Sequence, residues 1–206
     1  MRGALSWMLA IAAVAMIAGA LAILMKAHAG QILLDVSWKR ALAGGTAPAP
    51  WPWADTRPVA KLYAPRQRVE RLLLAGANGR TLAWGPGVAD GSARPGERGN
   101  AVVTAHRDTH FRFLADVTIG DALVIERPDG VRVAYRIVAT RIADASTLAT
   151  TLRRDADVPT LTLVTCWPLG AIVPGGTLRY VVVAEAVDRR PVTSVRAVDR
   201  ARTVVR

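Results

Sequence analysis

An uninterrupted apolar run at the N-terminus limits what the rest of the chain can be. From Gly3 to Met25 there is neither a charged residue nor a proline, and Arg2 and Lys26 flank the run. About 20 apolar residues, each rising 1.5 Å along a helix, cross the roughly 30 Å hydrocarbon core of a bilayer, whereas a secretory signal normally has a shorter apolar stretch. We therefore expect residues 1–28 to be a retained transmembrane anchor, with cleavage of this Ala-rich run as the alternative.

Residues 29–58 are expected to lead from the membrane to a folded domain. Apolar residues recur at helical spacing over Gln31–Leu42, which predicts a short amphipathic helix against the domain or the headgroup layer. The predicted apolar face consists of Leu34, Trp38, Ala41 and Leu42. Ala43–Pro58 is rich in Gly, Pro and Ala and is typical of a linker. Its Trp51 and Trp53 suit either the membrane interface or packing on the domain.

Residues 59–187 have the pattern of a small β domain. Short β-branched runs alternate with Gly, Pro and Asp turns, which favours a mainly β fold, a barrel or a sandwich, with short helices at Phe111–Val117 and Thr147–Arg153. Pro128-Asp129-Gly130 predicts a tight hairpin turn. The predicted strands are Val69–Leu74, Arg80–Trp84, Ala101–Thr104, Ala122–Arg127, Val131–Ala139, Thr160–Thr165 and Tyr180–Ala184.

The formal net charge of +11 favours anionic surfaces such as lipid headgroups, and much of the excess lies in the basic tail, residues 188–206. Nucleic acid is not an expected partner, because no zinc spacing, recognition helix or aromatic–basic sheet signature accompanies the charge. No cluster of His, Cys and carboxylates has ligand spacing, so neither a metal nor another cofactor is predicted.

Cys166 is the single cysteine, which excludes an internal disulfide. It ends the strand Thr160–Thr165 just before Trp167-Pro168, and a thiol at the end of a strand is more exposed than one in its middle. This position favours a reactive thiol. A lone cysteine that serves only as a small buried hydrophobe is the alternative.

A second strand end carries histidine. The segment Ala105–Phe111 follows the predicted strand Ala101–Thr104 and contains His106 and His110. An ordinary thiol, with a pKa of about 8.5, is only slightly ionised at neutral pH, so a cysteine enzyme needs an imidazole to exchange its proton. Both histidines are candidates, since His28 lies beside the anchor.

Arg179 opens the strand that follows the Cys166 loop, and a hairpin would return it toward the thiol. Because a guanidinium stays protonated and offers several donors, it can hold a substrate carbonyl or stabilise an oxyanion. A solvated charge at the start of a strand is the alternative.

The run Thr162-Leu163-Val164-Thr165-Cys166 resembles the TLxTC signature of sortases. Ala105-His106-Arg107 upstream and Arg179 downstream follow the family's order of His, Cys and Arg, although many sortases have glycine at the position of Ala105. The stretches Gly99–Leu114 and Thr162–Tyr180, the anchor and the PWPWAD linker further resemble the sortase class of Gram-negative bacteria.

The resemblance implies a sortase-like closed β-barrel over residues 59–187. It implies Cys166 as the acylating nucleophile, His106 as the acid and base, and Arg179 as the substrate or oxyanion residue. It also implies that Thr165 helps to shape the binding groove or the oxyanion site. His110 falls outside the motif.

The activity implied by the resemblance is transpeptidation. Cys166 would attack a carbonyl in the C-terminal sorting signal of a secreted protein, and an amine acceptor at the cell envelope would resolve the thioester. The protein would sit in the inner membrane by a single pass with its domain in the periplasm, an orientation that the charges beside the anchor leave open. A cysteine protease or hydrolase with the same residues, and a non-catalytic membrane-tethered binding domain, are the alternatives.

Overall fold

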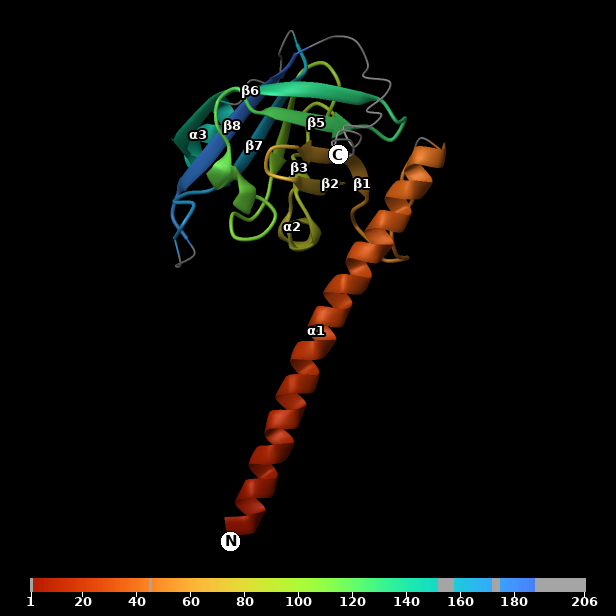
Figure 1. Cartoon of the computed structure of the whole chain (residues 1–206), viewed down its shortest axis with the longest axis vertical. Coiled ribbons are helices and arrows are strands. Elements are labelled where there is room, and N and C mark those ends of the chain that lie inside the picture. Colours follow the sequence, from red (N-terminus) through yellow and green to blue (C-terminus); the bar gives the residue numbers. More distant parts are fainter. Residues whose placement is uncertain (1, 45, 152–157, 172–174, 188–206) are drawn as a thin grey trace, which may run out of the picture.

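A long helix and a closed β-barrel make up the structure, a computed structural model that describes residues 2–44, 46–151, 158–171 and 175–187 (Figure 1). The helix projects from one side of the barrel and carries the N-terminus at its far end. Along the chain the elements are α1 (Arg2–Gly44), β1 (Pro58–Ala64), β2 (Val69–Ala75), α2 (Gly79–Trp84), β3 (Gly87–Val88), β4 (Asn100–Thr104), the 3-10 helix η1 (Arg112–Asp116), β5 (Ala122–Glu126), β6 (Arg132–Asp144), α3 (Ala145–Thr151), β7 (Thr160–Cys166) and β8 (Leu178–Ala186).

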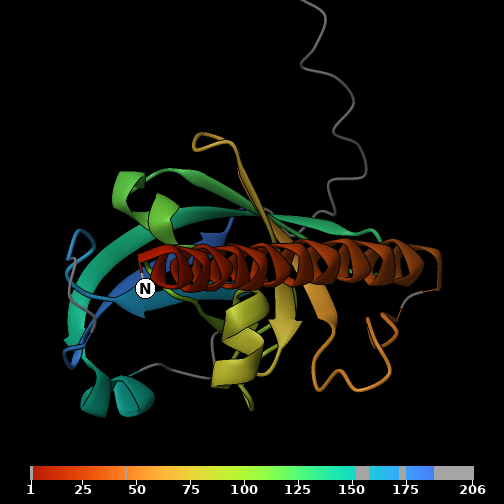
Figure 2. The same ribbon diagram turned by 90° about the horizontal axis from the view of Figure 1, so that it is seen from below.

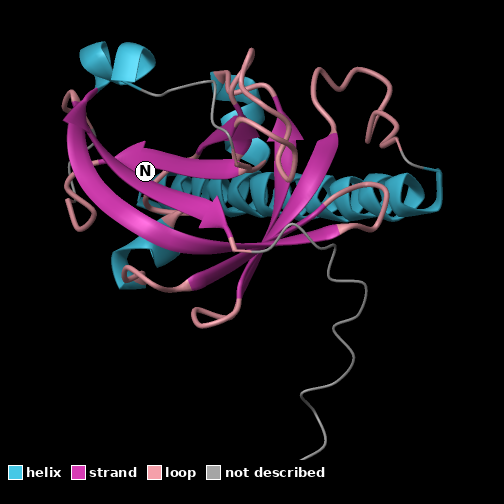
Figure 3. Ribbon diagram, turned by 90° about the horizontal axis from the view of Figure 1, so that it is seen from above, coloured by secondary structure: helices cyan, strands magenta, loops and turns pink. Residues whose placement is uncertain are grey.

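The strands close in the order β1-β2-β3-β4-β7-β8-β6-β5, with β5 pairing back onto β1. Two neighbouring pairs, β2–β3 and β4–β7, are parallel and the others are antiparallel. The helices lie outside the strands (Figure 3). The prediction of a mainly β, closed barrel with short helices and a preceding apolar helix is confirmed.

Strand alternation separates an inner from an outer apolar layer. In β7, Leu161 and Leu163 are fully buried in the barrel core, while Val164 belongs to a smaller outer cluster with Val102 and Val181. Successive side chains of a strand point to opposite faces, so Cys166, two residues after Val164, points outward. The strand therefore fills the core and presents its last residue on the outer face.

The hairpin predicted at Pro128-Asp129-Gly130 is confirmed between β5 and β6. The Gly130 N–H donates to the Arg127 carbonyl at 2.9 Å, and the Arg127 N–H donates to the Val131 carbonyl at 2.9 Å. Gly130 has a φ of 78°, a conformation that glycine adopts without steric cost.

One predicted strand is wrong, and two strands were not predicted. Arg80–Trp84 is not a strand but most of α2, because Asn78 caps this segment by accepting hydrogen bonds from the N–H groups of Arg80 and Thr81. The strand β1 was not predicted, although its residues alternate between buried and half-buried, since Pro58 was assigned to the linker. The short strand β3 was also missed.

The two predicted short helices are shifted rather than absent. Phe111–Val117 contains the 3-10 helix Arg112–Asp116, and Thr147–Arg153 overlaps α3, which starts at Ala145 because β6 runs on to Asp144. Residues 152–153 of that prediction, and the predicted basic tail 188–206, lie outside the described residues.

A carboxylate at the start of β5 ties the turn between β1 and β2 to the barrel. The Arg66 guanidinium donates to both Asp121 oxygens at 2.9 and 2.8 Å. Burial raises the pKa of Asp121, but hydrogen bonds from the Thr118 backbone and from the side chains of Arg66, Gln67 and Thr118 outweigh it and lower the pKa to about 2.

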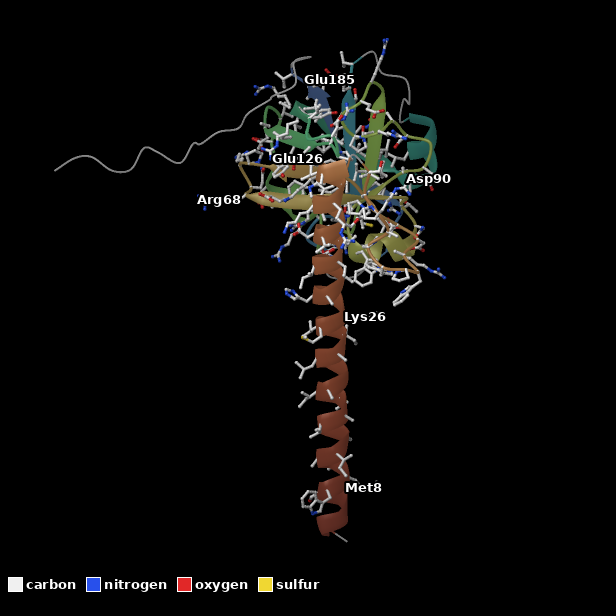
Figure 4. The ribbon with its side chains drawn as sticks, turned by 90° about the vertical axis from the view of Figure 1, so that its right-hand side faces the viewer. Met8, Lys26, Arg68, Asp90, Glu126 and Glu185 are labelled. Atoms are coloured by element: carbon white, nitrogen blue, oxygen red, sulfur yellow. The ribbon has the colours of Figure 1, made fainter. Side chains whose placement is uncertain are left out.

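The helix α1 is continuous from the apolar run into the domain. Leu34, Trp38 and Ala41 of the predicted apolar face are 1%, 2% and 0% exposed, because this end packs against the barrel, whereas Leu42 is 41% exposed. Met8 and Lys26 lie on the part that projects from the barrel (Figure 4). Within the described residues, α1 is the one helix long and apolar enough to cross a membrane.

Candidate active site

Cys166 and Arg179 face each other across β7 and β8. They are register partners in this antiparallel pair, and Cys166 is a free, half-buried thiol at the last position of its strand. Directly opposed residues of an antiparallel pair lie on the same face with Cβ atoms about 4.5–5.5 Å apart. The Cys166 and Arg179 side chains thus start side by side on the outer face of the barrel.

His106 reaches the same end of the barrel through the parallel pairing of β4 and β7. Thr104 is in register with Val164, and the ladder continues beyond β4 because the Ala105 N–H donates to the Val164 carbonyl at 3.2 Å. The next residue on each chain segment is Ala105 beside Thr165, and after these come His106 and Cys166. His106, whose side chain is exposed, is thus two residues beyond the end of β4, at the end of the barrel where β7 ends in Cys166.

Thr165 secures this arrangement from the inside. Its side chain is 2% exposed, and its hydroxyl donates to the Ala105 carbonyl at 2.8 Å. The hydroxyl therefore holds the backbone next to His106.

Arg107 connects the two loops and was not predicted. The residue is only 4% exposed, and its Nη1 donates to the Pro168 carbonyl at 2.9 Å while its Nε donates to Asp108 at 3.0 Å. It thus joins the segment with His106 to the segment after Cys166. The sequence carries no signal for this, because an arginine in a polar loop is ordinarily exposed.

The start of β8 is held by its own hydrogen bonds and by the end of β6. Arg179 donates through Nη1 to the carbonyls of Gly176 and Leu178, each at 2.9 Å, which leaves its Nε and Nη2 without a hydrogen-bond partner among the described residues. Hydrogen bonds from Ser146 and Thr177, with the nearby charge of Arg179, lower the pKa of Asp144 to about 2. Asp144 therefore stays ionised beside this arginine.

Two aromatic rings flank the Cys166–Arg179 pair. Trp167 follows the cysteine and Tyr180 follows the arginine, and their rings stack with centroids 5.8 Å apart. Offset stacking of this kind adds stability beyond the area that it buries. The two strand ends are thus joined by side chains as well as by the ladder.

His110 is half-buried in the segment that follows β4. It lines a hollow of about 460 Å³ together with residues of α1, β1 and β2. Burial lowers the pKa of His110, and the charges of Arg71 and His106 lower it further. Over the part of the chain that is described, no group of three or more His, Cys, Asp or Glu side chains could hold a metal ion.

Comparison with known proteins identifies this architecture. A family model described as "Sortase domain" matches residues 62–187. The chain belongs to the sortase family. This sortase is 32% identical over 127 residues to Sortase D of Bacillus subtilis (strain 168), an alignment that covers 61% of the chain and 62% of the relative. It thus spans less than two thirds of that relative's length.

Solved sortase structures share its fold. The Sortase D5 transpeptidase of Clostridium perfringens matches at 25% identity and a TM-score of 0.56 over 64% of this chain and 80% of that one. Sortase A from Corynebacterium diphtheriae matches at 29% identity and a TM-score of 0.57 over 68% and 65% of the two chains. A Clostridium perfringens sortase C with the C-terminal cell wall sorting motif matches at 19% identity and a TM-score of 0.57 over 80% and 90%, which shows the shared fold alone.

Proposed function

We propose that this sortase is a membrane-anchored cysteine transpeptidase that cleaves a C-terminal sorting signal and transfers the acyl group to an amine. One observation carries the proposal: Cys166 and Arg179 are register partners at the end of β7, and the parallel β4–β7 ladder ends two residues before His106 and two before Cys166. A thiol, an imidazole and a guanidinium at one rim are the groups that acyl transfer through cysteine requires.

The first half of the reaction forms a thioester. The Cys166 thiolate attacks a backbone carbonyl carbon of the signal, and the carbonyl π electrons move onto oxygen. When the tetrahedral intermediate collapses, the C–N bond breaks and His106, as the imidazolium, gives its proton to the departing amine. The acyl group is then bonded to sulfur and the C-terminal fragment leaves as an amine.

The second half reverses these roles. An acceptor amine attacks the thioester carbonyl and loses a proton to the neutral His106, and the C–S bond breaks with its electron pair returning to Cys166. Arg179 supports both halves because its Nε and Nη2 donors can hold the substrate carbonyl or the oxyanion without losing a proton.

Two buried residues position these groups. Thr165 holds the Ala105 carbonyl and so fixes the backbone that precedes His106. Arg107 holds the Pro168 carbonyl and so fixes the segment that follows Cys166. We assign to both the part of setting the distance between imidazole and sulfur, which makes the groove-shaping role of Thr165 an indirect one.

The proposed substrates are secreted proteins that carry a C-terminal sorting signal, and the proposed acceptor is an amine at the cell envelope. Membership of the sortase family is the ground for this proposal, and a solved sortase C was determined with such a sorting motif. We propose that α1 anchors the protein in the inner membrane with the barrel in the periplasm. We also propose that it belongs to the Gram-negative class of sortases, because of the motifs quoted above. Tethering would raise the effective concentration of tethered substrates. A reporter fused to the C-terminus should be active outside the cytoplasm, and activity only in the cytoplasm would contradict this orientation.

Mass spectrometry of the full chain in detergent or nanodiscs tests the reaction. Incubation with exported proteins of the cell should add an acyl group to Cys166 that hydroxylamine removes, and Cys166→Ala should show none. An added amine should then appear in the product. A product that is the same with and without amine would mean a hydrolase, and an unmodified, alkylation-resistant Cys166 would mean a non-catalytic domain.

A further inference from the structure

The helices α1 and α2 are in direct contact where Gly30 meets Trp84. Gly30 packs so closely on Trp84 that a Cβ at this position would lie 2.1 Å from the indole Cζ3, and the Gln31 amide donates to the Trp84 carbonyl at 2.8 Å. Seen from below, α2 lies beside α1 (Figure 2). The height of α2 along the anchor helix is therefore set by residue 30.

That height falls within the headgroup layer of a bilayer. Gly30 is four residues past Lys26, which ends the apolar run, and four residues of helix rise about 6 Å. The polar layer on each side of a bilayer is roughly 5–8 Å thick, the difference between the full thickness and the hydrocarbon core. When the apolar run fills the core, α2 consequently lies among the headgroups.

The neighbouring side chains have the composition of a membrane interface. Trp51 packs on Trp84 with ring centroids 4.9 Å apart, and the turn that it starts closes with the Ala54 N–H donating to its carbonyl at 3.0 Å. Trp53 at the tip of this turn is 82% exposed. The Arg80 side chain on α2 is 87% exposed, 3.8 Å from Asp55. Tryptophan and arginine are enriched where protein meets headgroups.

We propose that α2 and the turn 51–55 form a lipid-contacting edge whose partner is the headgroup layer of the bilayer that α1 spans. The Trp53 indole inserts among the headgroups and the Arg80 guanidinium binds a lipid phosphate. This inference rests on the proposed anchoring by α1. Together with α1, the edge gives the barrel a second attachment and a fixed tilt on the membrane.

Nitroxide accessibility of the full chain in nanodiscs containing phosphatidylglycerol tests the edge. Cys166→Ala removes the single native cysteine, and labels are placed one at a time through Trp53→Cys, Arg80→Cys, Met16→Cys and Glu185→Cys. Glu185 is exposed on the far side of the barrel from the projecting part of α1 (Figure 4) and is the solvent control. The measured quantity is the collision rate with a water-soluble nickel chelate relative to that with oxygen.

Nickel access should be lowest at position 16 and highest at position 185. At positions 53 and 80 we expect nickel access severalfold lower than at position 185. If position 16 is shielded while positions 53 and 80 are as accessible as 185, the edge is overturned and the anchor stands. If position 16 is itself as accessible as 185, α1 does not span the bilayer and both fall. Neither outcome affects the proposed thioester chemistry, which the mass spectrometry tests separately.

Discussion

The variant Arg107→Met should destabilise the sortase and slow its acylation together. The Arg107 side chain is 3% exposed and donates to the Pro168 carbonyl at 2.9 Å. Methionine keeps much of the apolar stem while removing that bond and the bond to the exposed Asp108. Hydrogen bonds from charged groups contribute about 1.5–3 kcal/mol. The free energy of unfolding, measured by denaturant titration of the full chain in detergent, should fall by about that amount.

The expected effect on rate follows from what the bond joins. Without it, the segment carrying His106 is no longer tied to the segment after Cys166, and a displacement of about 1 Å in a reacting pair costs roughly 10²-fold in rate. Thioester formation under single-turnover conditions should slow by about 10- to 100-fold. Because Arg107 is buried and does not face the substrate, the Michaelis constant should change much less.

Arg136→Met is the matched control. Arg136 also donates through Nη1 to a backbone carbonyl, that of Gly120, at the same distance of 2.9 Å, but it is exposed. Its loss should cost at most about 0.5 kcal/mol and leave the acylation rate unchanged. Equal acylation rates for the two variants would refute the positioning role, and equal unfolding free energies would refute the energetic reasoning.

Three further changes probe the rest of the fold. Thr165→Val removes the hydrogen bond to the Ala105 carbonyl and should lower the free energy of unfolding by about 1–2 kcal/mol and slow acylation about tenfold. Thr162→Val, whose hydroxyl donates to the Asn100 side chain, should lower stability by a similar amount without slowing acylation. An equal slowing in both variants would contradict the positioning role of Thr165. Asp121→Asn should lower stability at pH 7. Because the pKa of Asp121 is about 2 in the folded state and about 3.9 in the unfolded state, the stability deficit relative to wild type should disappear as the pH falls from about 4 through 2. Denaturant midpoints at pH 7, 4 and 2.5 measure this deficit, and a deficit that is the same at every pH would exclude the carboxylate as its cause. Gly30→Leu should overpack Trp84 and cost about 1–3 kcal/mol, with Gly19→Leu, where a Cβ meets nothing within 4 Å, as the harmless control in thermal unfolding.

The pattern of the chain predicts its local features better than its long-range contacts. Alternation and turn chemistry were enough for the β5–β6 hairpin, because a Pro-Asp-Gly turn specifies its own geometry. The same alternation misled at Arg80–Trp84, where the cap from Asn78 decides for a helix. The strand β1 was missed because it contains a proline and small alanines, and its position is set by pairing with β2 on one side and β5 on the other.

The places of Cys166 and Arg179 in the fold were predictable from the sequence, whereas the contacts that support them were not. The strand-end positions of Cys166 and Arg179 can be inferred from the sequence, and the structure supplies their pairing in register. The burial of Arg107 depends on a loop that lies 61 positions away, which no local pattern encodes. The catalytic roles themselves stay predictions.

The parallel pairing of β4 with β7 bears on when the proposed thiol–imidazole pair can first form during folding. The residues that this pairing joins, such as Ala105 and Thr165, are 60 positions apart, and the two strands between them, β5 and β6, belong to other parts of the wall. In an unfolded chain the sulfur would therefore be far from the His106 imidazole most of the time. The thiol of such a chain would therefore stay unreactive until β4 and β7 have paired.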